Sequence, residues 1–227
     1  MINKSALNTV VNNIAKNRKS KKSNQVKIIA ITKGFPASSI ISAQENGLCD
    51  IGESKIQETE NKQAAINKKT TTHFIGRLQS NKVRKAIQLY NVIQTVHSTK
   101  LAKRIDGICK TINRNQKIYL QVNIGRDPNK QGFDPSIIEE EAKKINNMTN
   151  LKVCGIMMIP PNRKIDNIYR DYHKKTKALQ EVIYQNGATD FLNISMGMSR
   201  DYDIAIQEGA THIRLGSILF RKRITQC

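Results

Sequence analysis

Short runs of β-branched and other apolar residues alternate with amphipathic segments along most of the chain. The apolar runs predict eight strands, at residues 26–32, 49–52, 73–75, 92–95, 118–122, 153–157, 191–194 and 212–215. Between them apolar positions recur with helical spacing, for example at residues 40–46, 82–89, 100–112, 137–145 and 168–184. Alternating strands and helices are typical of parallel sheets, and eight such units predict closure into a barrel. The pattern therefore predicts an α/β fold, a single (β/α)8 barrel of the TIM type.

The segment before the first strand has a helical pattern of its own. Its apolar residues form one stripe, at Leu7, Val10, Val11 and Ile14. We expect this extra N-terminal helix to pack on the barrel. Because the chain has no acidic residue before Glu45, a basic transit peptide is the alternative interpretation.

No composition break or Gly/Ser/Pro-rich linker divides the chain. We therefore expect one domain over residues 1–227, with the helix and a basic joint in residues 1–25 and the barrel in residues 26–227. The joint is a cluster of basic side chains at Arg18, Lys19, Lys21 and Lys22. An open doubly wound sheet is the alternative fold, but no Gly-x-Gly-x-x-Gly motif follows the first predicted strand.

The formal net charge of +20 raises the hypothesis of a nucleic-acid-binding protein. The basic residues are scattered over most of the chain, and the sequence is equally rich in Asn and Ile, as an AT-rich coding sequence would make it. Aromatic residues make up only 5% and Trp is absent, whereas single-strand binders stack bases on aromatic rings. Nucleic-acid binding is therefore the less favoured hypothesis.

The apolar runs and the cysteines bear on location. No run approaches the roughly 18 apolar residues of a membrane span. The four cysteines form no Cys-x-x-Cys pair, and with the four histidines they show no metal-ligand spacing. Isolated thiols are typical of a reducing compartment, so we expect a cytoplasmic protein without a metal site.

A lysine closes the first predicted strand, in Lys27-Ile-Ile-Ala-Ile-Thr-Lys33-Gly-Phe-Pro36. Alternation places Ile29, Ile31 and Lys33 on one face, so Lys33 would stand in the barrel mouth above an isoleucine floor. Partial desolvation and nearby cations would lower its pKa from about 10.4 towards neutrality. Such a lysine suits Schiff-base chemistry, although in a lysine-rich chain one strand-end lysine is weak evidence.

Two glycine- and hydroxyl-bearing segments follow the last two predicted strands. One is Asn193-Ile-Ser195-Met-Gly197-Met-Ser199-Arg-Asp201, where we expect Ser199 to be the N-cap of the next helix. The other is Arg214-Leu-Gly216-Ser217, again a glycine and a hydroxyl at an expected helix start. Phosphate sites built from the loops after strands seven and eight recur in barrels, so the two segments together predict a phosphate site.

The chain resembles the YggS/PROSC family of pyridoxal 5′-phosphate (PLP) homeostasis proteins. The resemblance runs in order from the first predicted strand to the C-terminus. It rests on Ile31-Thr-Lys33-Gly-Phe-Pro36, Gly52-Glu53, Gln57-Glu58, His73-Phe-Ile-Gly76-Arg-Leu-Gln79-Ser-Asn81-Lys82, Gln121-Val-Asn123-Ile, Asn129-Lys130-Gln-Gly132, Gly155-Ile-Met157-Met-Ile-Pro160, Ser195-Met-Gly-Met-Ser199 and Ile213-Arg214-Leu-Gly216-Ser217.

The resemblance implies a barrel like the N-terminal domain of alanine racemase and a role in PLP (vitamin B6) homeostasis with little or no catalysis. It implies PLP as an internal aldimine on Lys33, with Arg214 facing the pyridine nitrogen. The phosphate ligands it implies are Ser195, Gly197, Ser199, Gly216 and Ser217.

Four further residues are secondary candidates: Ser54, His73, Met157 and Lys130. We expect His73 to pack or hydrogen-bond to a neighbour, Met157 to form a pocket wall, and Lys130 to lie in a loop where it could meet the cofactor. The chain departs from the family pattern in two places. Ser54-Lys55 replaces Asn and an aromatic residue near the cofactor ring, and Arg221 replaces a glycine beyond the phosphate loop.

The enzyme alternative is a PLP-dependent amino-acid racemase. Enzymes like alanine racemase carry a second, tyrosine base on a further C-terminal domain, and here the sequence ends about ten residues after the eighth predicted strand, which favours a carrier. The expected partners are PLP and, as recipients, apo forms of PLP enzymes, and we expect a monomer or weak dimer.

Overall fold

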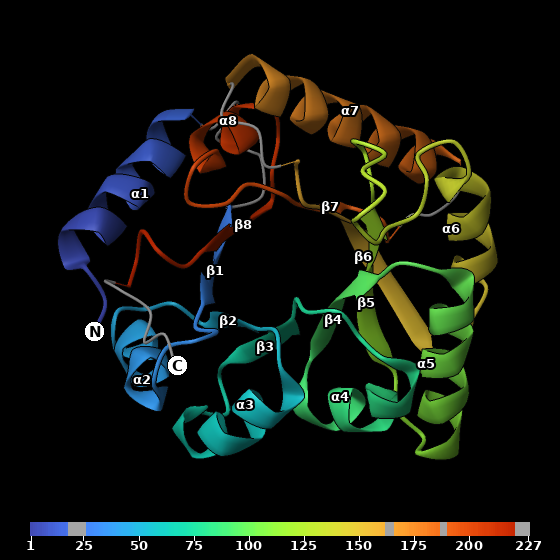
Figure 1. Cartoon of the computed structure of the whole chain (residues 1–227), viewed down its shortest axis with the longest axis horizontal. Coiled ribbons are helices and arrows are strands. Elements are labelled where there is room, and N and C mark those ends of the chain that lie inside the picture. The colour runs from blue at the N-terminus through green and yellow to red at the C-terminus, as the bar shows by residue number, and fades with distance from the viewer. Residues whose placement is uncertain (18–25, 162–165, 187–189, 221–227) are drawn as a thin grey trace.

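A computed structural model describes residues 1–17, 26–161, 166–186 and 190–220 (Figure 1). Eight parallel strands form a closed barrel in sequence order. They are β1 (Lys27–Ile31), β2 (Asp50–Glu53), β3 (Thr71–Phe74), β4 (Val92–Val96), β5 (Gln116–Val122), β6 (Leu151–Met158), β7 (Asn193–Ser195) and β8 (His212–Leu215). The predicted (β/α)8 barrel is confirmed.

Helices form a ring outside the strands, as Figure 1 shows. They are α1 (Lys4–Asn17), α2 (Ala37–Glu45), α3 (Ile56–Lys62), α4 (Val83–Leu89), α5 (Thr99–Thr111), α6 (Ile138–Asn146), α7 (Asp166–Gln185) and α8 (Tyr202–Gln207), with 3-10 turns at Gln63–Ala65 and Ser80–Lys82. Each predicted strand overlaps an observed one, and the helical segments agree to within three residues at each end. None of the described helices has the length and apolar composition needed to cross a bilayer.

The N-terminal helix packs on the barrel, as its apolar stripe predicts. Leu7 and Val10 are buried, whereas Val11 at the edge of the stripe is 49% exposed. The Asn13 side-chain amide donates a hydrogen bond of 2.7 Å to the Tyr202 hydroxyl at the start of α8. The basic joint expected at residues 18–22 lies outside the described residues.

The main apolar core lies between the strands and the helix ring, and the barrel interior is more polar than expected. The Ser195 hydroxyl on β7 donates to Gln94 Oε1 on β4, at 2.8 Å. These strands are not neighbours, so the bond crosses the interior. His73, Ser195, His212 and Arg214 are all buried as well. The isoleucine floor inferred from β1 is therefore only part of a mixed interior.

Candidate functional site

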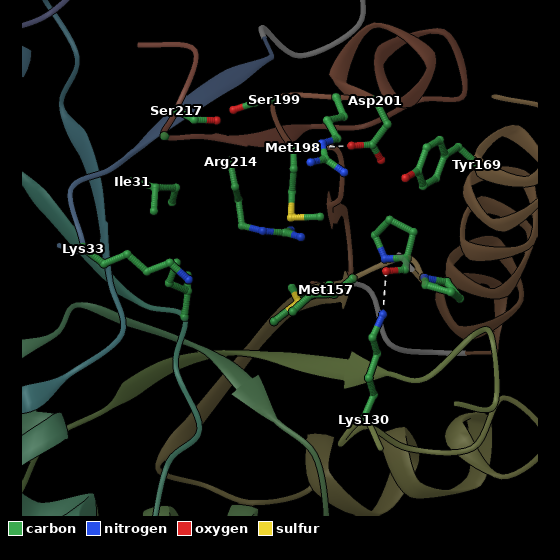
Figure 2. Close-up of a pocket in the computed structure, with 16 residues that line it drawn as sticks. Ile31, Lys33, Lys130, Met157, Tyr169, Met198, Ser199, Asp201, Arg214 and Ser217 are labelled. Atoms are coloured by element: carbon green, nitrogen blue, oxygen red, sulfur yellow. Dashed lines mark hydrogen bonds between the residues drawn. The ribbon is translucent and has the colours of Figure 1, made fainter. Parts of the chain in front are cut away.

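A cavity of about 380 Å³ opens at the carboxyl ends of the strands, where barrel chemistry usually lies. Its walls come from the ends of β1, β6 and β8 and from the loop after β7 (Figure 2). Five of the residues predicted to bind the cofactor line it, namely Lys33, Ser199, Arg214, Gly216 and Ser217. Two secondary candidates, Met157 and Lys130, line it too.

Lys33 stands on a tight turn at the end of β1. The Phe35 N–H donates to the Thr32 carbonyl at 3.0 Å, and Gly34 has φ +71°. A positive φ at the third position is typical of a type II turn and favours glycine there. Figure 2 shows the half-buried Lys33 side chain reaching from this turn into the cavity.

Arg214 enters the cavity from β8 and is held at two points. One guanidinium nitrogen donates to the Ser195 hydroxyl at 2.8 Å, and the other donates to the Met158 carbonyl at 2.7 Å. Burial lowers the pKa of Arg214 to about 10, against the opposing charge of Asp201, so the side chain stays cationic at pH 7. The cavity therefore contains a fixed positive charge.

A chain of hydrogen bonds runs from Arg214 through the barrel interior. Ser195 accepts from Arg214 and donates to Gln94, whose amide meets His73 Nδ1 at 3.0 Å. His73 Nε2 lies 2.9 Å from the Asp50 carboxylate, which only accepts. With a neutral His73 protonated on Nε2, each group in this series of hydrogen bonds donates to the next one, from Arg214 to Asp50, so every donor has an acceptor. The predicted hydrogen-bonding role of His73 is confirmed.

The loop after β7 is anchored by a buried His–Asp pair. Asp201 accepts from His173 Nε2 at 2.9 Å and from the Met198 N–H at 2.8 Å. Gly197 has φ +86°, and a Cβ there would lie 2.5 Å from Ala205 Cβ. The glycine and the pair together fix the path of residues 197–201 beside the cavity.

The helix starts expected in the two phosphate segments differ from those observed. Helix α8 has Asp201 at its N-cap, so the N-cap role expected for Ser199 is wrong. The Ser199 hydroxyl instead accepts from the Ile218 N–H at 3.4 Å, which joins the two segments. After Gly216 the described residues form a turn, closed by the Leu219 and Phe220 N–H groups on the Gly216 carbonyl at 2.9 Å, and not a helix.

Ser199, Gly216 and Ser217 therefore meet at one corner of the cavity. A Cβ on Gly216 would lie 3.3 Å from Ile31 Cβ and 3.4 Å from the Ile31 carbonyl oxygen, so the turn packs closely on β1. Figure 2 shows the two hydroxyls at this corner and Lys33 reaching in from β1.

Lys130 closes the opposite side of the cavity. Its Nζ donates to the Pro160 carbonyl at 2.6 Å and lies 3.9 Å from an Asp127 carboxylate oxygen. Burial lowers the pKa of this lysine, and Asp127 opposes the shift. A second cavity of about 270 Å³ adjoins here and shares Ile75, Lys130 and Ile159 with the first.

The remaining candidates lie outside the cavity wall. Ser195 is fully buried beneath Arg214, with its hydroxyl engaged on both sides. Gly197 shapes the loop, and the Ser54 carbonyl packs against Gly76, where a Cβ would lie 2.0 Å from it. Arg221 lies outside the described residues.

Sequence reasoning missed several residues that support the site. Gln94, which accepts from Ser195, lies within a predicted strand with nothing to mark it. His173, the partner of Asp201, lies one helical turn after Tyr169, a cavity-lining residue of α7. Lys62 is buried against Glu53 and Glu58, and the Glu58–Lys62 spacing of four residues was the available signal.

Comparison with known proteins identifies the family. The sequence model described as "Alanine racemase, N-terminal domain" matches residues 5–223. A protein of Synechocystis sp. named "Pyridoxal phosphate homeostasis protein" is 35% identical over 201 residues, which are 88% of this chain and 92% of that protein. This chain belongs to the pyridoxal phosphate homeostasis protein family.

Two solved structures of a protein named PipY extend the likeness to the fold. PipY of Synechococcus elongatus without PLP has a TM-score of 0.87 and 32% identity, over 95% of this chain and 98% of that one. PipY with PLP bound has a TM-score of 0.84 and 30% identity, with the same coverage.

Proposed function

We propose that this chain binds PLP in the cavity at the carboxyl end of the barrel and serves intracellular PLP homeostasis. The observation that carries the proposal is the convergence of Lys33, the Ser199–Ser217 corner and Arg214 on one cavity. These groups suit a phosphorylated aldehyde, because an amine can attack the aldehyde carbon, and hydroxyl groups and a cation favour an anionic phosphate. The homeostasis role of the family supports the same function.

The described residues fit this cofactor. The cavity is within the range of small-ligand pockets, roughly 300–1,000 Å³. Its apolar wall of Ile31 and Met157 suits an aromatic ring. Among the described residues of the wall the one carboxylate is Asp201, which is engaged by His173 and the Met198 N–H, so the cationic groups dominate the field felt by a phosphate.

Each residue then has a distinct role. Lys33 Nζ would hold the aldehyde carbon covalently, and Ser199, Gly216 and Ser217 would receive the phosphate. Gly197 and Asp201 hold the loop that presents Ser199, and Ser195 orients Arg214. When bound, PLP supplies an electrophilic carbon and an electron sink for amino-acid chemistry.

We propose that catalysis by this chain is slow or absent. Arg214 stays cationic and is fixed by Ser195 and Met158, so it would disfavour a proton on a basic ring nitrogen placed beside it. An unprotonated ring is a weaker electron sink. The protein would then hold PLP in its barrel domain and release it to apo forms of PLP enzymes. We further propose that the protein is cytoplasmic, consists of this one domain, and is a monomer or weak dimer.

Two measurements test this function against its alternatives. The PLP-loaded protein should restore activity to an apo PLP enzyme, and it should exchange the α-proton of L-alanine in deuterated water slowly or not at all. Exchange with racemisation at rates near the roughly 1–10³ s⁻¹ of enzymes would favour the racemase. Steeply salt-dependent nucleic-acid binding without any PLP binding would favour the nucleic-acid protein.

A further inference from the structure

The turn that carries Lys33 is tied to a buried ion cluster outside the cavity wall. The cluster consists of Glu53 at the end of β2 and of Glu58 and Lys62 on α3, and we call it the brace. Lys62 and Glu53 have side-chain exposures of only 7% and 2%. A lysine is seldom buried to this degree unless it is paired, so its contacts need an explanation.

All three hydrogen-bond donors of the Lys62 ammonium have an acceptor. Its Nζ lies 2.8 Å from Glu53 Oε1, 2.6 Å from Glu58 Oε1 and 2.9 Å from the Thr32 carbonyl oxygen. Two of these partners belong to the brace, and the third is the backbone of the residue before Lys33. An ammonium has three donors, so this one is saturated.

The two carboxylates also bind the turn directly, each at a different residue. Glu58 Oε1 accepts from the Gly34 N–H at 2.6 Å, and Glu53 Oε1 accepts from the Thr32 hydroxyl at 2.7 Å. The residues on either side of Lys33 are therefore both bonded to the brace. The direction in which Lys33 leaves the backbone depends on these two residues.

The brace depends on the lysine to hold its two carboxylates together. Burial raises the pKa of Glu53, and the hydrogen bond and charge of Lys62 oppose that shift. Glu53 Oε2 has no hydrogen-bond partner among the described residues. Without Lys62, the two carboxylates would repel each other, and the Thr32 carbonyl would lose the donor that ties it to them.

We infer that Lys62 is a positioning residue, which together with Glu53 and Glu58 fixes the turn so that Lys33 Nζ meets the aldehyde of a bound PLP. The inference rests on the proposed function, because it concerns the same lysine. Lys62 itself lies outside the cavity lining and is saturated by its acceptors, so it is not a competing nucleophile.

Two ligands separate positioning from general stability. PLP can bond covalently to Lys33, whereas pyridoxine 5′-phosphate has the same ring and phosphate but no aldehyde. In the Lys62→Met variant we expect covalent attachment of PLP, followed by absorbance, to slow about tenfold or more. The affinity for pyridoxine 5′-phosphate should stay within about twofold of wild type.

A matched control is Lys144→Met. Lys144 also contacts two glutamates, Glu140 at 2.7 Å and Glu141 at 2.9 Å, but it is 52% exposed on α6. This control should bind both ligands like the wild-type protein.

A second pair of variants keeps the test valid if Lys62→Met does not fold. Glu58 is 22% exposed, so changes there are better tolerated. Glu58→Gln retains an oxygen for the Gly34 N–H and should attach PLP within about threefold of the wild-type rate. Glu58→Ala removes that acceptor and should attach PLP about tenfold more slowly, with unchanged pyridoxine 5′-phosphate binding.

Two results would overturn the inference alone. One is attachment of PLP at the wild-type rate in Lys62→Met and Glu58→Ala. The other is an equal loss of both ligands in these variants, which would mean that the brace only stabilises the fold. A wild-type protein that attaches no PLP would instead overturn the proposed function, and the inference with it.

Discussion

The Ser195→Ala variant tests whether Ser195 supports Arg214, as its hydrogen bonds indicate, or binds the phosphate, as the family resemblance implies. The hydroxyl accepts from Arg214 at 2.8 Å and donates to Gln94 at 2.8 Å, in a fully buried position. Its removal leaves one buried donor and one buried acceptor unpaired. At about 1–3 kcal/mol for each, the free energy of unfolding should fall by roughly 2–6 kcal/mol.

The measurement is urea unfolding of the PLP-free protein, with Ser217→Ala as the matched control. Ser217 is an exposed serine of the cavity rim, so its substitution should change the free energy of unfolding by less than about 0.5 kcal/mol. It should instead weaken PLP binding by about 1 kcal/mol, the worth of one hydrogen bond. Equal stabilities of Ser195→Ala and Ser217→Ala, with PLP affinity lowered in both, would refute the role of Ser195 as a support for Arg214.

Three further predictions follow from the same geometry. Gly197→Ala should lower the free energy of unfolding by roughly 2–4 kcal/mol, because φ is +86° and the new Cβ would lie 2.5 Å from Ala205 Cβ; a wild-type urea midpoint would contradict this. Ser199→Glu should reduce PLP affinity by well over the roughly 1 kcal/mol of a lost hydrogen bond, since a carboxylate would face the phosphate, and equilibrium titration measures it. Burial lowers the pKa of His212 to about 3, aided by His73 and opposed by Asp50. The unfolded chain, with a pKa of about 6.5, takes up the proton first, so stability should fall as pH drops below 6.5, by roughly 2 kcal/mol at pH 5. His212→Asn should flatten that slope, and an unchanged slope in this variant would exclude His212 as the cause.

Strands such as β1 and β4 were predictable because each carries several β-branched residues, most of which the barrel buries. The short strands β2, β7 and β8 have one β-branched residue each and were predictable from their place in the alternation of strands and helices. Helix α3 gave no such signal, since Ile56 is the only apolar residue in Ile56-Gln-Glu-Thr-Glu-Asn-Lys62. It buries Ile56, Thr59 and the lysine at its end, Lys62. Apart from its four-residue spacing from Glu58, the sequence shows that lysine only as one more basic residue in a chain rich in them.

The place of Lys33 at the cavity was predictable, because this lysine closes an apolar strand whose alternation directs it into the barrel mouth. The roles of neighbouring serines were not predictable in the same way. Ser195 is the last residue of β7 and points into the interior, while Ser199 follows it and lines the cavity. The partner of Ser195 is Gln94, 101 residues away, and only the closed barrel brings them together. The local sequence therefore could not distinguish a serine that supports Arg214 from a serine that lines the cavity.

The most direct test of the central claim is to locate the PLP. The protein would be loaded with PLP, reduced with borohydride to make the lysine linkage permanent, digested, and mapped by mass spectrometry. We predict one modified site, Lys33, with the label lost in Lys33→Ala while the circular dichroism spectrum is retained. A label found mainly on Lys130, or a label that persists in Lys33→Ala, would contradict the claim that Lys33 holds the cofactor.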